Sequence, residues 1–175
     1  ATERWLDEGP RFQDEAAAGA CREVLSLLAD DGERSFAEQF LGAMPERYVY
    51  GNSPEAIAVH VRLAQRSLSH RALVECVASD GQYLELAVVA LDRPGLLAMI
   101  TATLTASGLQ VVAAQVYSWT AVDGKTRAFD LFWVAAGSRA RALDNLVPKL
   151  EAGLLRLVNG EMDALTLVAS GGRRE

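Results

Sequence analysis

The residue types best suited to chemistry form a short turn, Asp92-Arg93-Pro94-Gly95, between a β-rich run and a helix-patterned run. Proline is tolerated at an early helical position, and glycine leaves room for another group to approach the backbone. The amides of Gly95 and of the two residues after it then have no partner within the helix and attract an anion. The Asp92 carboxylate is placed to receive an ammonium group. The turn therefore offers a partner for both charges of a free amino acid.

The same turn also allows a purely structural interpretation. In that interpretation Asp92 caps the helix and Gly95 relieves crowding, and no ligand is bound. A helix dipole stabilises an exposed carboxylate by only about 0.3–1 kcal/mol, and by about 2 kcal/mol in a partly buried site. An amino-acid site at this turn therefore needs a second wall.

The elements that position the turn belong to a carboxyl-terminal region with alternating strand and helix patterns. Hairpin signals at Asp80-Gly81 and Asp123-Gly124 join strands that are neighbours in the sequence. When the run at 72–77 is set aside, the order from 83 to 169 is βαββαβ, which predicts an α+β, ferredoxin-like antiparallel sheet with both helices on one face. The periodicity predicts, in order, strands at 72–77 and 84–91, a helix at 96–108, strands at 109–119 and 127–135, a long helix capped by Ser138 and kinked or split by Pro148, and a strand at 163–169.

The amino-terminal region has a different pattern, and we expect two regions, a helical one at 1–70 and a ferredoxin-like one at 71–175. Helical spacing begins near residue 12 and ends at Asp30-Asp31-Gly32. We therefore expect the first part of the chain to form a helical layer.

Two further helix starts are expected in this layer. Ser35 and Glu38 have the spacing of a capping box, which predicts a helix that ends before Pro45. Ser53 as the N-cap and Pro54 as the first helical residue predict the next helix.

Composition excludes several classes of function. The net charge of −6 disfavours nucleic acid, because phosphate binding needs a basic surface. Cys21 and Cys76 are too few for a zinc cluster or a disulfide framework, and His60, on the apolar side of a helix, is expected to be a hydrogen-bonded packing residue. No apolar run approaches the roughly 20 residues of a membrane span. We expect a reduced, cytoplasmic protein with no cofactor, no metal, no nucleic-acid partner and no membrane contact.

Three segments resemble ACT domains, the small-molecule regulatory modules of amino-acid metabolism. More narrowly, Asp-Arg-Pro-Gly-Leu and the later Asp-x-Phe-x-Val are similar to the carboxyl-terminal sensor region of the bifunctional uridylyltransferase/uridylyl-removing enzymes that modify PII nitrogen-signalling proteins. The segments 45–48 and 53–60 are similar to the part that precedes that sensor, so the likeness covers roughly residues 40–169. The three ACT-like segments are 91–97, 108–115 and 129–134.

The resemblance implies a non-catalytic module that binds a small amino acid, with glutamine as the first expectation. ACT domains typically hold the amino acid between two modules, against the strand-to-helix turn of one and the start of the second strand of the other. Because only six residues follow Ala169, the second module is expected from another chain, as a homodimer through the ACT sheet. A catalytic domain or a signalling protein is a further expected partner. The positions that match ligand-binding ones are Asp92, Arg93, Gly95, Leu96, Leu97 and Gln110.

The sequence also departs from the family pattern. Many relatives have Asn where this chain has Gln110, one methylene longer. The catalytic domains of the enzymes need a Gly-Ser motif followed by Asp-x-Asp and an adjacent His-Asp pair. Neither pattern is present at Gly137-Ser138, His60 or His70, so we expect no catalytic residues. The alternative function is a structural or dimerisation module with a decayed ligand site, and RNA binding is disfavoured by the missing basic groove.

Overall fold

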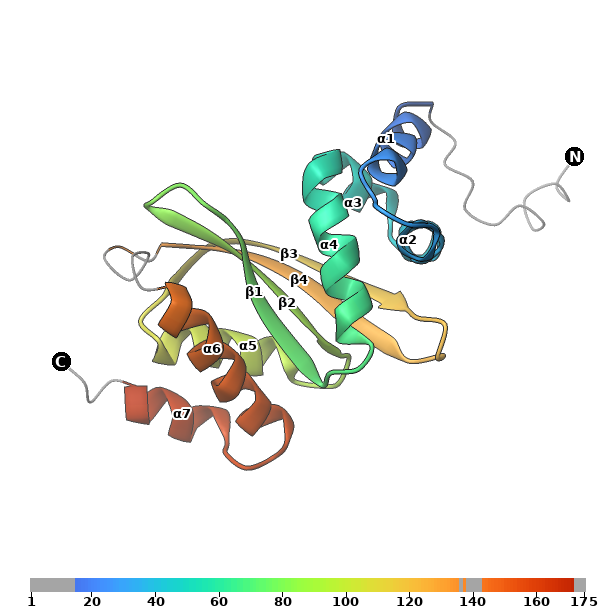
Figure 1. The fold of residues 1–175 in the computed structure, drawn as a ribbon. Helices are drawn as coiled ribbons and strands as arrows, with labels where there is room; N and C mark the ends of the chain where they lie inside the picture. Colours follow the sequence, from blue (N-terminus) through green and yellow to red (C-terminus); the bar gives the residue numbers. More distant parts are fainter. Residues whose placement is uncertain (1–14, 136, 138–142, 172–175) are drawn as a thin grey trace, which may run out of the picture. The chain divides into compact units, whose positions relative to one another are not determined.

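The computed structural model describes residues 15–135, 137 and 143–171 of the 175-residue chain (Figure 1). The chain divides into two compact units, residues 1–62 and residues 63–175. The division falls inside a helix, α4 (Pro54–Ser67).

The first unit consists of helices. They are α1 (Glu15–Ser26), α2 (Asp31–Ala43), α3 (Glu46–Gly51) and the first part of α4. Buried side chains from all four helices form its core: Val24, Phe40, Tyr48, Ile57 and His60.

The expected start of α4 is confirmed, because the Ala56 amide donates to Ser53 Oγ at 3.2 Å. The end of the preceding helix before Pro45 is also confirmed, but the sequence analysis missed α3, for which Pro45 is the N-cap. With 6 residues, α3 is too short for its apolar side chains to show the helical period in the sequence.

The capping box predicted at Ser35 and Glu38 is wrong. The Asp30 carboxylate accepts from the Glu33 amide at 2.8 Å, and the Glu33 carboxylate accepts from the Ala29 amide at 2.9 Å. The helix starts at this earlier position because it then gains another turn and places carboxylates at its positive end. The first helix ends at Ser26, before the expected Asp30-Asp31-Gly32, and residue 12 lies outside the described part of the chain.

The second unit is α+β, with a four-stranded antiparallel sheet in the order β1-β2-β4-β3 (Figure 1). Tight hairpins join β1 to β2 and β3 to β4, as predicted. The strands are β1 (Ala72–Ser79), β2 (Tyr83–Leu91), β3 (Gln110–Thr120) and β4 (Thr126–Ala135), and the helices are α5 (Leu96–Ala106), α6 (Leu143–Val158) and α7 (Ala164–Gly171).

The strand predicted at 163–169 is wrong, because this segment forms α7. In the βαββαβ order the last strand lies beside the first, which here is β2. That place is taken by β1, which pairs with β2 from Ala72 opposite Ala90 onward. Closing the short hairpin between β1 and β2 costs less chain entropy than bringing the distant segment 163–169 to β2. β1 therefore occupies the edge beside β2, and the last segment finds no vacant edge there. It forms a helix instead, capped by Asp163, which accepts from the Thr166 amide at 2.8 Å.

The core of the second unit lies between the sheet and the two helices α5 and α6, which cover the same face (Figure 1). Alternate residues of each strand point into this core, as in any pleated sheet. α6 continues through Pro148 without being split, and Ser138 lies outside the described residues. Within the described ranges, no helix combines the length and the apolar character that a membrane crossing needs. The principal side chains of the core between the sheet and these two helices are Leu84, Leu86, Val88, Leu96, Ile100, Leu104, Phe132, Leu150 and Leu154.

Candidate functional site

The candidate turn joins β2, which ends at Leu91, to α5, which begins at Leu96. Gly95 is the N-cap residue and has φ +81° and ψ 0°, a left-handed conformation that favours glycine. Pro94 therefore precedes the helix and does not form its first turn as predicted. The N-cap residue is therefore Gly95, and no side chain of the described residues caps the helix there. The capping role considered for Asp92 is wrong.

Backbone hydrogen bonds hold the turn in place. The Asp92 amide donates to the Thr126 carbonyl at 3.0 Å, and the Leu96 amide donates to the Arg93 carbonyl at 3.2 Å. One of the three amides expected to bind an anion is thus used within the turn. The Leu96 side chain is buried, whereas that of Leu97 is 47% exposed.

Arg93 connects the turn to the end of α6. Its Nη1 donates to the carbonyl of Val158, the last residue of that helix, at 2.6 Å. A cation at this position is favourable, because the last carbonyls of a helix lack partners and carry partial negative charge. The guanidinium therefore has a structural role in this chain.

Gln110 lies far from the turn within one chain. It is the first residue of β3 and pairs with Ala135, whereas Asp92 is hydrogen-bonded to Thr126 at the other end of β4. Nine residues of strand separate these two positions, which corresponds to about 30 Å. The structure therefore brings together five of the six predicted ligand-binding positions and leaves Gln110 at the opposite end of the sheet.

The strand that carries Gln110 is at one edge of the sheet. In the described part of the chain, β3 pairs with β4 on one side only. Its exposed apolar side chains include Val111, Val112 and Val116, which are 38%, 58% and 41% exposed. An edge strand with apolar side chains is a template for pairing with another strand.

Asp130 is a buried carboxylate in the middle of β4 that the sequence analysis missed. Its side chain is 1% exposed, and its Oδ1 has no hydrogen-bond partner among the described residues. Burial raises its pKa to about 7; a backbone hydrogen bond from Tyr117 opposes this shift, and the nearby Asp92 carboxylate adds to it. The sequence did contain a signal for its burial. Asp130 lies midway between Ala128 and Phe132, and alternate residues of a strand point to the same face, which here is the core.

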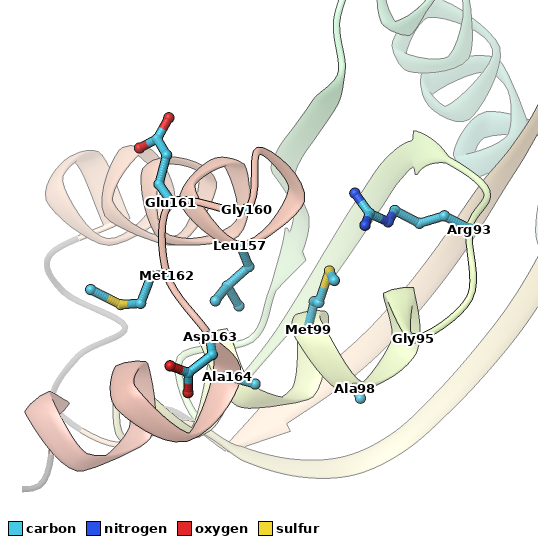
Figure 2. A pocket seen from close by; sticks show the side chains of 10 residues that line it. All are labelled: Arg93, Gly95, Ala98, Met99, Leu157, Gly160, Glu161, Met162, Asp163 and Ala164. Atoms are coloured by element: carbon cyan, nitrogen blue, oxygen red, sulfur yellow. The ribbon is translucent and has the colours of Figure 1, made fainter.

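A pocket lies on the other side of the turn, between α5 and the segment that joins α6 to α7 (Figure 2). Its volume is about 690 Å³, with Met99 and Leu157 on its apolar wall and Arg93 at one end. The Glu161 carboxylate points away from Arg93 in Figure 2, and the Asp163 carboxylate is bound to Thr166. The pocket thus offers an apolar surface and one cation.

Among the described residues, no group of three or more His, Cys, Asp and Glu side chains is placed to hold a metal ion. Cys21 and Cys76 are free thiols.

No family model matches the sequence. The chain is similar to a bifunctional uridylyltransferase/uridylyl-removing enzyme of Phenylobacterium zucineum (strain HLK1), with 31% identity over 128 residues. These residues make up 73% of this chain and 13% of the enzyme, so the chain corresponds to a small part of that relative.

Proposed function

We propose that this chain is a non-catalytic regulatory module of the ACT type that binds a small amino acid, with glutamine as the first candidate. The observation that carries the proposal is the Asp92–Gly95 turn, where a carboxylate and a left-handed glycine precede the start of α5. Similarity to a small part of a much larger enzyme supports a regulatory role.

In this proposal Asp92 binds the ammonium group of the amino acid. The carboxylate of the bound amino acid lies at the first turn of α5, where Gly95 has no Cβ and leaves room beside the backbone. Gln110 contributes from a second copy of the chain. Antiparallel pairing of two β3 strands would bring Gln110 of one copy to the end of the sheet that carries the turn of the other, because the two positions lie at opposite ends of the strand.

The test is a calorimetric titration with glutamine, next to a thermal-shift screen of the twenty amino acids. The variant Gly95→Val forces a β-branched residue into φ +81° and should abolish binding. Gly81→Val is the matched control, because Gly81 has φ +89° in the β1–β2 hairpin, away from the site. No heat and no thermal shift with any amino acid would reject the proposal.

A structural or dimerisation module is the second candidate. It is favoured by the two groups of the turn that the fold already uses, the Arg93 guanidinium and the Leu96 amide. This candidate predicts a dimer without ligand binding. A saturable thermal shift with one amino acid, lost in Gly95→Val and kept in Gly81→Val, would exclude it.

A further inference from the structure

A second pocket lies where the end of α5 meets α6 and the end of α7. Its volume is about 630 Å³, which is within the range of small-molecule sites. The Asp92–Gly95 turn precedes α5, whereas this pocket lies at the other end of that helix, about 16 Å away along its axis. The two pockets share no lining residue among those that the structure describes, so the second one is a separate candidate site.

Two cations of α6, Lys149 and Arg156, line this pocket. They are two helical turns apart on the same face of the helix, which corresponds to about 10 Å along its axis. Both side chains are exposed, and neither forms an ion pair or a hydrogen bond with the described residues. Their two positive charges are therefore available to a ligand.

The described walls of the pocket contain no acidic side chain that could neutralise these cations. α5 and α7 have no charged residue in their sequences. The acidic residues of α6 are Asp144 and Glu151, and the helical period places both on another side of the helix from the two cations. The Glu151 carboxylate accepts from the Val74 amide of β1 at 2.9 Å. The pocket is thus locally positive in a chain whose net charge is −6.

The helix ends at the pocket do not need the two cations as caps. The Leu104 carbonyl accepts from the Leu109 amide at 3.0 Å, and the Thr105 carbonyl accepts from the Gly108 amide at 2.9 Å. Backbone donors therefore already satisfy the last turn of α5. The ends of α5 and α7 together carry about one negative charge, which is less than the two positive charges that face them.

Two hydroxyl groups at the end of α5 add neutral donors to the pocket. The side chains of Thr105 and Ser107 line it and make no hydrogen bond with the described residues. By contrast, Ser170 Oγ donates to the Leu167 carbonyl at 2.7 Å and is already used within α7. Hydroxyl groups can donate to a negatively charged oxygen, so Thr105 and Ser107 complement the two cations.

We propose that this pocket binds a small organic dianion whose two negative charges stand apart, one held by Lys149 and the other by Arg156. The inference goes beyond the proposed function and does not depend on it. The separation of the two cations along α6 suits a dicarboxylate better than two charges on one phosphate group. The planar guanidinium of Arg156 matches a carboxylate with two parallel hydrogen bonds, and Lys149 supplies a compact charge.

Gly171 allows α7 to form a wall of the pocket. A Cβ at this position would collide with the carbonyl group of Ala106 at the end of α5. The two helix ends can therefore be this close only because residue 171 is glycine. The pocket depends on this contact, since Leu167, Val168 and Gly171 belong to its lining.

The first experiment is an NMR titration of the intact chain with succinate and with the longer dicarboxylate adipate. Saturable shifts are expected for amides of residues 103–108, 149–156 and 167–171. Acetate, with a single charge, should bind at least about tenfold more weakly, because one charge contact is missing. No saturable shift at these residues with either dicarboxylate overturns the proposal. Tighter binding of inorganic phosphate than of both dicarboxylates also overturns it, because the charges then need not stand apart.

Charge variants test the two cations. Lys149→Gln and Arg156→Gln should each weaken dicarboxylate binding about tenfold, the effect of losing one hydrogen bond to a charged group. Lys125→Gln in the β3–β4 hairpin and Arg22→Gln in α1 are the matched controls, because both residues are exposed and remove the same charge outside the pocket. Equal weakening by the controls would show attraction to overall charge and overturn the site.

Gly171→Ala tests the pocket itself while both cations stay in place. The added Cβ should force the end of α7 away from α5 and abolish dicarboxylate binding. Gly42→Ala is the control, because a Cβ at Gly42 in α2 meets open space. Thermal unfolding of both variants verifies that the fold is kept. Unchanged binding in Gly171→Ala overturns the role of this pocket, and if that variant fails to fold, the charge variants decide.

Discussion

The Tyr48 hydroxyl lies 2.9 Å from Nδ1 of His60, and both side chains are fully buried in the first unit. The bond joins α3 to α4, and the two rings are also in contact, with centroids 5.9 Å apart. The prediction that His60 is a hydrogen-bonded packing residue is thereby confirmed. Burial lowers the pKa of His60 to about 4.

Tyr48→Phe should destabilise the helical unit, because it removes the hydroxyl and leaves the buried Nδ1 of His60 without this partner. The expected loss in the free energy of unfolding is about 1–3 kcal/mol. Denaturant unfolding at pH 7 measures it. Tyr50→Phe is a suitable control, because Tyr50 is in the same helix but 53% exposed.

Acid should also destabilise the helical unit. The pKa of His60 is about 4 in the folded chain and about 6.5 when unfolded, so the unfolded state binds more protons between these values. Stability from a neutral His60 is therefore complete above pH 6.5 and lost as pH falls toward 4. The measurement is denaturant unfolding followed by the NMR signals of residues 15–62. A His60→Gln variant should show a smaller loss over the same range.

The second unit should respond to pH with the opposite sign. The pKa of Asp130 is about 7 in the folded chain and about 3.9 when unfolded, so the folded state holds the proton more tightly. Its free energy of unfolding should fall as pH rises from about 4 to about 7 and stay level above that. Asp130→Asn should remove this slope and Asp144→Asn should keep it. If stability instead rises with pH in both the intact chain and Asp130→Asn, the raised pKa of Asp130 in the folded chain is contradicted.

Arg93→Met tests whether the Arg93 guanidinium serves the fold or the ligand. The variant keeps the apolar stem but removes the donor to the Val158 carbonyl. Because the bond is exposed, the expected cost is only about 0.5–1 kcal/mol of unfolding free energy. Lys149→Met, on the exposed side of the same α6, is the control. Unchanged stability with weakened glutamine binding would instead assign Arg93 to the ligand.

Val112→Lys should prevent the proposed pairing of two β3 edges. Val112 is 58% exposed beside the register shift of β3, and a charge there opposes strand addition. Light scattering or sedimentation should show a dimer for the intact chain and a monomer for this variant. Val122→Lys, 72% exposed in the β3–β4 hairpin loop, should remain dimeric. A monomeric intact chain contradicts the dimer directly.

The sequence by itself determined the features that depend on neighbouring residues. Ser53 and Pro54 start α4, and the hairpins at Asp80-Gly81 and Asp123-Gly124 join the strands that were expected. Gly81 and Gly124 have φ +89° and +73°. Such signals are readable because a cap or a tight turn is stabilised by side chains and dihedral preferences within a few residues.

The tertiary structure decided which segments became partners. The segment 163–169 has a short apolar run that suits a strand or a helix, and it became α7 because β1 already occupied the edge beside β2. The separation of Gln110 from Asp92 and the burial of Asp130 in the core likewise follow from strand register. Strand pairing is a competition between distant segments for one edge, and its outcome depends on the whole chain at once.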